Sequence, residues 1–363
     1  MADTDHAPLR WGILSTAKIA AQHLVPAMHD RAGHRAHAVG SRALDRATQW
    51  AKANDIVTAH GSYEALLADP DVDAIYNPLP NHLHVDWSIA ALEAGKHVLC
   101  EKPLGLDAAD AQRLVDAATA HPDLVAMEAF MYRFHPQWST ARDLVATGAI
   151  GTVKTIQTFF AYFNDDPGNI RNQADIGGGA LMDIGCYPIS QARMVLDAEP
   201  LRVTGSMELD PRFGTDRLTS AMLDFGDGTT AMFTVSTQLE PFQRACIFGT
   251  EGRIEIKIPV NSPNDAPTEL TITTSTGSET RSVGPVDQYG EQLDAFASAV
   301  RAGTPAPVPL SDGVANMRVI DAVVEAASAG AWVGISKDNA AGPQHRWGTR
   351  RWSASSPTRQ SVS

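Results

Sequence analysis

Two groups of polar residues have the types and the spacing that acid–base chemistry needs. The first is Glu101-Lys102-Pro103, which follows an apolar stretch at residues 98–100 that is typical of a buried strand. In an open α/β sheet, ligands bind just outside the carboxyl ends of the strands, so Lys102 is predicted to lie in an active site. A partly desolvated lysine beside a bound cation has a lowered pKa and exchanges protons near neutral pH. The alternative is that Lys102 only binds a ribose hydroxyl or pairs with Glu101.

The second group is Asp183 and Tyr187, which stand four residues apart and therefore share one face of a helix. A phenol can donate a hydrogen bond to a substrate hydroxyl or accept one, and a carboxylate one turn back can orient it or bind a neighbouring hydroxyl. The alternative is an acid that complements the helix dipole, followed by a core tyrosine. No histidine or second acid stands at ligand spacing, so no metal is predicted here.

Other polar residues allow two interpretations each. Glu128 and His135 flank the sequence A-F-M-Y-R-F, where two domains are expected to join, and they either line a crevice or pack the domains together. His84 follows the sequence N-P-L-P-N-H-L, and it either contacts a ligand or caps the next helix. The sequence supports neither a Ser-His-Asp nor a Cys-His arrangement.

The first third of the chain predicts a doubly wound parallel sheet, because short apolar strands alternate with helical patterns over residues 9–127. Asp107 has the type and position of a helix N-cap. The predicted strands span residues 10–15, 35–42, 56–59, 73–76, 98–100 and 124–127. The predicted helices between them include residues 16–29, 43–53, 63–68 and 107–120.

The turn after the first strand and the end of the second strand are where such a domain binds a dinucleotide. A G-x-G-x-x-G/A fingerprint is expected at the turn, and this chain has Ser15, Ala17 and Ala20 at those positions. Small residues allow a pyrophosphate to approach, although any strand-to-helix turn has a similar composition. At the second strand end stand Ser41 and Arg42 in place of a carboxylate, which predicts NADP over NAD unless the arginine only opens a helix.

The chain after residue 130 predicts a second domain of longer strands in series, with helices at residues 137–147, 178–196, 289–301 and 313–328. Few crossovers separate the strands, so a largely antiparallel open sheet with helices on one face is expected. Self-association through the bare face, as a homodimer or homotetramer, would cover it. Residues 339–363, rich in serine and arginine, are expected to be a disordered tail.

The composition excludes several classes of protein. A net charge of −13 argues against nucleic-acid or anionic-membrane partners. Three scattered cysteines form neither a metal motif nor a disulfide framework, which is typical of a reducing compartment. The sequence has no secretory signal and no apolar run of membrane-spanning length, so we expect a cytoplasmic location.

Six motifs in order resemble the Gfo/Idh/MocA oxidoreductases over about residues 9–330. They are W-G-I-L-S-T-A-K-I-A, S-R, N-P-L-P-N-H-L-H, A-G-K-H-V-L-C-E-K-P, E-A-F-M-Y-R-F-H-P and M-D-I-G-C-Y-P-I. Within the family the chain is most similar to NADP-dependent xylose dehydrogenases, dihydrodiol dehydrogenases and glucose-fructose oxidoreductase. It departs at Ser15 and Ala17, where two glycines are usual. Many relatives have a histidine where Tyr187 stands.

The resemblance implies an α/β protein with a Rossmann dinucleotide-binding domain at residues 1–128. It also implies an α/β domain with a large, mostly antiparallel open sheet, which binds substrate and mediates self-association at residues 129–338. Lys102 and Tyr187 are then the catalytic pair, assisted by Asp183. The predicted cofactor-binding residues are Ser15, Thr16, Ala17, Lys18, Ile19, Ser41, Arg42, Arg46, Asn77, Pro78, Leu79, Asn81, His84, Glu101 and Lys102.

The implied activity is reversible hydride transfer between NADP, or NAD, and a carbinol carbon of a sugar, cyclic polyol or diol. An aldose such as xylose or glucose, oxidised to its lactone, is the substrate that the resemblance favours. Two alternatives stay open at this point. One is a glycosidase that uses NAD in an internal redox cycle, and the other is a sensor of sugar or cofactor without turnover.

Overall fold

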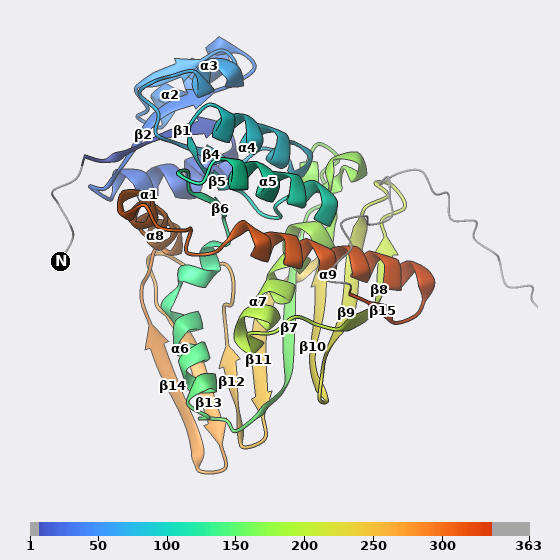
Figure 1. The fold of residues 1–363 in the computed structure, drawn as a ribbon. Helices are drawn as coiled ribbons and strands as arrows, with labels where there is room; N and C mark the ends of the chain where they lie inside the picture. Colours follow the sequence, from blue (N-terminus) through green and yellow to red (C-terminus); the bar gives the residue numbers. More distant parts are fainter. Residues whose placement is uncertain (1–6, 336–363) are drawn as a thin grey trace, which may run out of the picture.

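Residues 7–128, which we call the first half of the molecule, are built on a six-stranded parallel sheet with the order β3-β2-β1-β4-β5-β6 (Figure 1). This computed structural model describes residues 7–335. The order reverses between β1 and β4, as in a dinucleotide-binding fold, so the predicted doubly wound sheet is confirmed. The strands are β1 (Leu9–Leu14), β2 (His34–Gly40), β3 (Thr58–His60), β4 (Ala74–Asn77), β5 (His97–Cys100) and β6 (Ala126–Glu128).

Helices cover this sheet near their predicted positions. The oxygen Oδ1 of Asp107 accepts a hydrogen bond from the Asp110 amide at 2.7 Å, which confirms the predicted N-cap. The first helix begins at Ala20 rather than at Thr16, because residues 15–19 form the turn after β1. The helical elements are a π-helical turn (Ala20–Leu24), α1 (Val25–His29), α2 (Leu44–Ala53), α3 (Tyr63–Leu67), α4 (His84–Glu93) and α5 (Ala108–Ala120).

Residues 129–335, which we call the second half, are built on a nine-stranded sheet with the order β14-β13-β12-β11-β7-β10-β9-β8-β15. Every neighbouring pair is antiparallel except β7 and β10. Gly226, Asp227 and Gly228 all have positive φ and form the predicted turn between β9 and β10. The strands are β7 (Val153–Phe163), β8 (Arg202–Leu209), β9 (Asp216–Gly226), β10 (Thr229–Ser236), β11 (Gln238–Gly249), β12 (Gly252–Ile256), β13 (Thr268–Thr274), β14 (Gly277–Val283) and β15 (Val333–Gly334).

The sequence predicts strands near β7 to β13 but neither β14 nor β15, and it predicts only residues 244–248 of β11. Residues 277–282 of the edge strand β14 are exposed, so its sequence lacks the alternation that identifies a half-buried strand. The first part of β11, residues 238–243, is also largely exposed and carries a register shift against β7.

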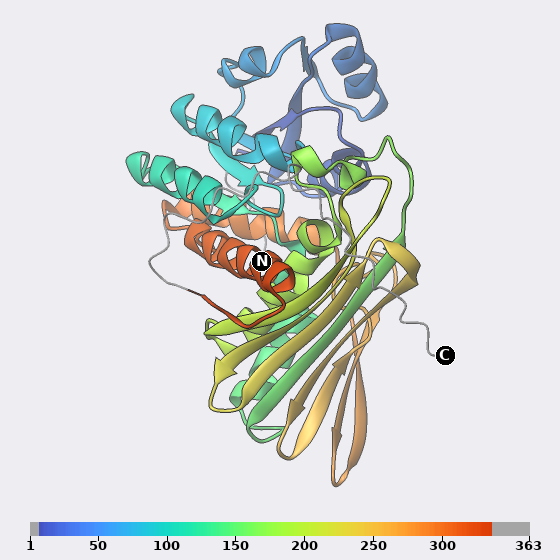
Figure 2. The same ribbon diagram turned by 90° about the vertical axis from the view of Figure 1, so that its right-hand side faces the viewer.

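Helices lie on one face of the large sheet, and Figure 2 shows that no helix within residues 7–335 covers the other face. This matches the predicted arrangement, and self-association through the bare face stays a prediction. The four helices of this half are α6 (Pro136–Ala146), α7 (Cys186–Leu196), α8 (Gln288–Ala302) and α9 (Leu310–Ala329). None of the helices within residues 7–335 is both long and apolar enough to cross a bilayer. The predicted tail at 339–363 lies outside the described residues.

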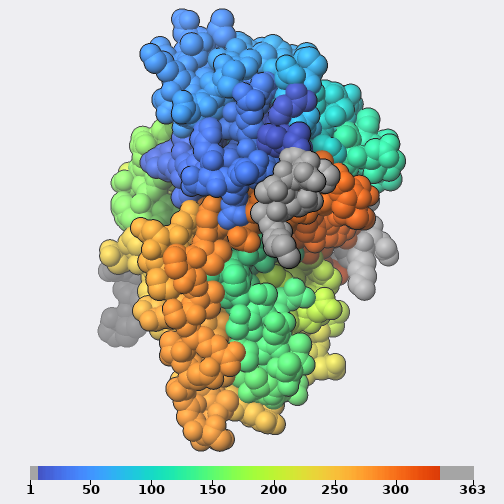
Figure 3. Space-filling model, turned by 90° about the vertical axis from the view of Figure 1, so that its left-hand side faces the viewer, coloured from blue at the N-terminus to red at the C-terminus, as the bar shows by residue number. Residues whose placement is uncertain are grey.

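Helix α8 joins the two halves, and Figure 3 shows the orange segments of the second half lying against the blue first half. Arg31, which follows α1, forms ion pairs with Glu291 and Asp294 of α8. The ring nitrogen Nε2 of the buried His34 lies 2.9 Å from Asp294, and Arg301 donates to the Gly33 carbonyl at 2.7 Å. These polar contacts fix the relative position of the two sheets.

Glu128 is a buried acid at the junction of the halves. It ends β6, is 2 % exposed, and its Oε2 atom has no hydrogen-bond partner among residues 7–335. Burial, together with the nearby carboxylate of Asp312, raises the pKa of Glu128 to about 8. The side chain is therefore protonated in the folded protein at neutral pH.

Wild type should become less stable as the pH rises, and we predict that the E128Q substitution removes this loss of stability. Between pH 4.5 and about 8 the unfolded chain releases this proton while the folded chain keeps it, so the free energy of unfolding falls as pH rises. Glutamine stays neutral, and the variant should gain about 3–4 kcal/mol on wild type between about pH 5 and pH 8. Urea unfolding at both pH values measures this. The same gain in E251Q, at an exposed position, would contradict the assignment.

Candidate active site

A cavity of about 860 Å³ lies at the carboxyl ends of β1, β2, β4 and β5 and is closed by residues of the second half. It includes the point between β1 and β4 where the strand order reverses, which is the usual ligand site of such a sheet. All three predicted catalytic residues line it. So do the predicted cofactor-binding residues except Asn77, namely Ser15, Thr16, Ala17, Lys18, Ile19, Ser41, Arg42, Arg46, Pro78, Leu79, Asn81, His84, Glu101 and Lys102.

The turn after β1 takes the conformation of a dinucleotide turn without its glycines. Ser15 has φ of 71°, in the left-handed region, and its amide donates to the Gly40 carbonyl at 2.9 Å. A non-glycine residue there costs about 1 kcal/mol. Lys18, Arg42 and Arg46 line this end of the cavity, so it suits a ligand that carries phosphates.

Asn77 and His84 shape the turn after β4. The Asn77 amide nitrogen donates to the His84 carbonyl and to Ser88 Oγ, each at 3.0 Å. The two ring nitrogens of His84 lie 2.7 Å from the Leu79 carbonyl and 2.8 Å from the Pro103 carbonyl. Their polar atoms are thus engaged within the protein, and Asn77 does not line the cavity. The structure favours positioning roles for both residues, with ligand contact left to the Pro78–Leu79 backbone.

Asp183 lies at the centre of the site, where residues of both halves meet. Lys102 Nζ donates to the Asp183 carbonyl at 2.7 Å and lies 3.2 Å from its Oδ1. On the other side, Oδ2 accepts from the Tyr162 hydroxyl at 2.5 Å and lies 2.8 Å from Arg171 Nε. Both carboxylate oxygens are engaged, so the structure gives Asp183 an anchoring role, and its binding of a substrate hydroxyl stays a prediction.

Sequence reasoning missed Tyr162, and it identified Arg171 only as one of the polar residues in the loop at 163–176, which either bind a polyol or are merely solvated. Tyr162 is the last residue but one of β7, and Arg171 lies in a short 3-10 turn (Ile170–Asn172) that Asn169 caps with a 3.0 Å bond to the Arg171 amide. Gly178 permits this approach, since a Cβ atom there would lie 2.6 Å from the Arg171 carbonyl oxygen. The triple glycine at residues 177–179 was the available sequence signal.

The charges of Asp183, Lys102 and Arg171 decide the direction in which the pKa of Lys102 is shifted. Burial alone would raise the pKa of Asp183, but Arg171 and Lys102 hold the pKa of that carboxyl well below its usual range. Burial alone would likewise lower the pKa of Lys102, but the Asp183 carboxylate raises it above its usual value. The predicted lowering of the Lys102 pKa is therefore wrong for this state, because the ion pair outweighs desolvation.

Tyr187 projects from α7 into the cavity and is 5 % exposed. Its hydroxyl has one polar neighbour among residues 7–335, the Met131 sulfur at 3.7 Å. Lys102 Nζ lies 5.0 Å from the centre of the tyrosine ring, over its face rather than at its hydroxyl. Burial, followed by the Cys186 thiol, raises the pKa of Tyr187 well above its usual value, so the phenol is protonated.

The remaining candidates lie around the cavity or away from it. Glu128 and His135 are buried outside it, so the domain-packing interpretation describes them. His135 Nδ1 accepts a hydrogen bond from the Gln137 amide at 3.2 Å. In the polar loop, Asn164 lines the cavity, whereas the side chain of Asn172 binds the backbone of the same loop.

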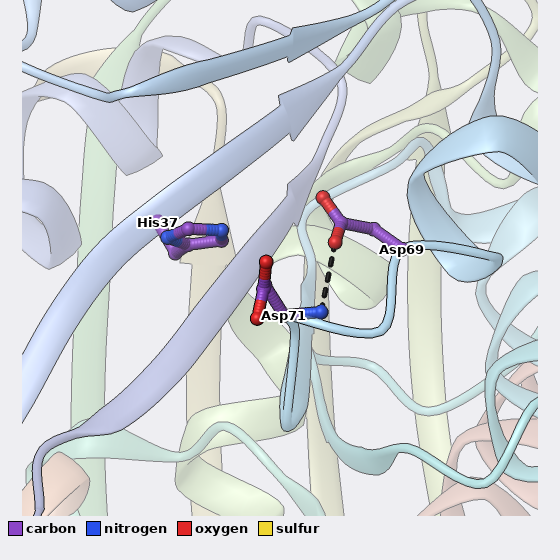
Figure 4. Close-up of side chains that lie close together, drawn as sticks. All are labelled: His37, Asp69 and Asp71. Atoms are coloured by element: carbon purple, nitrogen blue, oxygen red, sulfur yellow. Dashed lines mark hydrogen bonds between the residues drawn. The ribbon is translucent and has the colours of Figure 1, made fainter.

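One group of possible metal ligands occurs among residues 7–335, formed by His37, Asp69 and Asp71 (Figure 4). Asp69 and Asp71 precede β4, whereas the cavity lies beyond the carboxyl ends of the strands. Asp69 Oδ2 lies 2.9 Å from His60 Nε2, and Asp71 Oδ1 lies 2.7 Å from Arg10 Nη1. Both carboxylates are thus used in ion pairs, and the group has no part in the cavity.

We predict that D183N destabilises the fold, because Lys102 and Arg171 then lose their shared counter-charge in a buried site. The free energy of unfolding should fall by about 3 kcal/mol, as when one partner of a buried ion pair is removed. Urea unfolding at neutral pH measures this. The exposed Asp123 provides the control, and a D183N midpoint equal to that of D123N would refute the anchoring role.

Comparison with known proteins agrees with this fold. Residues 9–129 match an oxidoreductase family with an NAD-binding Rossmann fold, and residues 138–255 match the GFO/IDH/MocA C-terminal domain. An uncharacterised oxidoreductase of Rhizobium meliloti is 46 % identical over 89 % of this chain and 98 % of its own. A D-xylose 1-dehydrogenase (NADP⁺) of Haloferax volcanii is 39 % identical over 90 % of this chain and 99 % of its own.

A solved structure extends the likeness to three dimensions. A 3-ketoreductase from Actinomadura kijaniata, in complex with NADP and TDP-benzene, superposes with a TM-score of 0.83 at 33 % identity. The match covers 88 % of this chain and 98 % of the reductase. The similar proteins thus include one whose name specifies a free sugar and one crystallised with a nucleotide-derived ligand.

Proposed function

Because the chain belongs to the Gfo/Idh/MocA family of oxidoreductases, we propose that it is an NADP-dependent dehydrogenase acting on a neutral sugar or polyol. The observation that carries the proposal is the meeting of Lys102, Asp183 and Tyr187 in one cavity at the switch point of the sheet. Residues up to about 128 would hold the cofactor, and residues of the second half would supply the substrate side.

The cofactor assignment is supported by the charge of the first-half end of the cavity. Ser41 and Arg42 follow β2, and Lys18 and Arg46 lie nearby on the lining. A guanidinium and a hydroxyl at this position suit the 2′-phosphate that distinguishes NADP from NAD. The similar xylose dehydrogenase is named for NADP⁺, and the similar reductase was crystallised with NADP.

In the proposed reaction, this chain's residues bind the substrate and move one proton. The cofactor, when bound, exchanges a hydride with the carbinol carbon at C4 of its nicotinamide. The Tyr187 hydroxyl holds the proton at the substrate oxygen, giving it up in reduction and receiving it in oxidation. Lys102, fixed by Asp183, places its positive charge over the tyrosine ring and stabilises negative charge on the phenol oxygen.

A neutral substrate is favoured over a nucleotide-linked sugar by the lining of the second half. Asn164, Asn169 and Asn261 supply amides that suit hydroxyl groups. The cation on this side, Arg171, is already paired with Asp183, so it is not free to bind a diphosphate. We therefore favour an aldose, such as xylose or glucose, oxidised at its anomeric carbon to a lactone.

An assay of sugars and polyols with NADP⁺ and NAD⁺, followed at the nicotinamide absorbance, tests the activity. A nucleotide-linked sugar and an aryl glycoside complete the panel. Reduction of NADP⁺ by a neutral sugar supports the proposal, and a preference for the nucleotide sugar contradicts the neutral-substrate assignment. Glycoside hydrolysis without net cofactor reduction would indicate a redox glycosidase, and binding without turnover would indicate a sensor.

We predict that K102A lowers kcat by about a thousandfold, because general acid–base groups contribute about 10²–10⁴-fold and Lys102 supports Tyr187. NADPH binding, measured by fluorescence titration, should remain detectable in this variant. K257A, at an exposed lysine of the second half, serves as the control and should keep wild-type turnover. Full activity in K102A would rule out the assigned role.

We predict that R42A weakens NADPH binding by about tenfold or more, since it removes a charge-assisted hydrogen bond to phosphate. NADH lacks the 2′-phosphate, so its dissociation constant should change less than about twofold. Fluorescence titration of both cofactors measures the ratio without needing a substrate. R253A, an exposed arginine in β12, is the matched control. Equal weakening of NADPH and NADH would contradict phosphate recognition by Arg42.

A further inference from the structure

A second cavity, of about 460 Å³, is lined by residues of α6, α7 and α9. Four arginines line it, namely Arg133, Arg142, Arg193 and Arg318. Three acids line it as well, Asp197, Glu199 and Asp312, so the lining carries one net positive charge (4 − 3 = 1). We call it the arginine cavity. It shares no residue with the catalytic group or with the cofactor turn.

Two of the four arginines are held by acids of the protein. Arg193 binds Glu199 through Nε and Nη2, each at 2.7 Å, and its Nη2 lies 3.1 Å from Asp312 Oδ1. Arg133 Nη2 donates to the other oxygen of Asp312 at 2.6 Å. Asp312 and Glu199 are thus both committed. These ion pairs form one polar side of the cavity.

The other two arginines lack such partners. Neither Arg142 nor Arg318 has a carboxylate within 4.0 Å in the part of the chain that the structure describes. The Nε atom of Arg318 is buried and has no hydrogen-bond acceptor among residues 7–335. A buried donor without a partner costs about 1–3 kcal/mol, and it calls for an ion or a polar ligand.

We propose that the arginine cavity binds a small organic phosphate. Arg142, an exposed residue, comes from α6 and Arg318 from α9, so arginines of two different helices line one space. A phosphate offers several oxygens, so two such forks can bind it at once. The wall of Met194, Leu201 and Ile335 is apolar and receives the carbon part of the ligand.

Calorimetric titration of the full-length protein with inorganic phosphate tests this site, with NADP⁺ present to fill the Arg42 end of the first cavity. Sodium chloride of equal ionic strength is the reference. Wild type should bind phosphate, and R318M and R142M should each weaken binding by about tenfold or more. R318K keeps the charge but loses the planar fork, so its affinity for phosphate should lie between those of wild type and R318M. Phenyl phosphate should bind more tightly than inorganic phosphate, because its ring also contacts the apolar wall.

The control is R253M, which removes an exposed arginine of β12 far along the chain from the cavity. It should bind phosphate as wild type does. Near-ultraviolet circular dichroism in sodium chloride establishes that each variant is folded. Equal phosphate binding in wild type, R142M, R318M and R253M would overturn the proposal, and so would the absence of binding to wild type. These readouts do not depend on turnover, so they stand apart from the test of the proposed reaction.

Discussion

One buried carboxylate between the two halves of the molecule constrains everything around it. Asp183 is held in a nearly closed space, where an uncompensated charge would be expensive. It stays ionised because Lys102 arrives from the first sheet and Arg171 from a turn that follows β7. Removing Asp183 would leave the two positive charges without their shared counter-charge. The site therefore exists only when both halves are folded and correctly placed.

The surrounding structure supplies that placement. Helix α8 binds the first half through Arg31 and His34, while α9 packs along α5. Around Tyr187, the rings of Phe130 and Tyr132 meet it edge to face, with centroids 5.4 and 5.8 Å away. These rigid contacts leave the phenol few orientations. The charge of Lys102 then acts on a ring that the core already holds.

The sequence predicted local features well and long-range ones poorly. Strand and helix periodicity located both sheets, and the strand end before Glu101 placed Lys102 in the cavity. Tyr162 could not be predicted, because its partner Asp183 lies 21 residues away and β7 itself gives no sign of the contact. The pKa of Lys102 was predicted in the wrong direction, since its sign depends on how close one carboxylate lies. Edge strand β14 has no buried face, so periodicity could not reveal it.

The contact between α9 and α5 has a consequence for synthesis on the ribosome. The carboxylate of Asp321 accepts a hydrogen bond from the Ala108 amide at the start of α5, although the two residues are 213 apart in the chain. At about 5–20 residues per second, this interval takes about 10–40 seconds to translate. During that time α5 lacks the helix that covers it. A nascent chain therefore carries an uncovered helix face long after its first sheet has been synthesised.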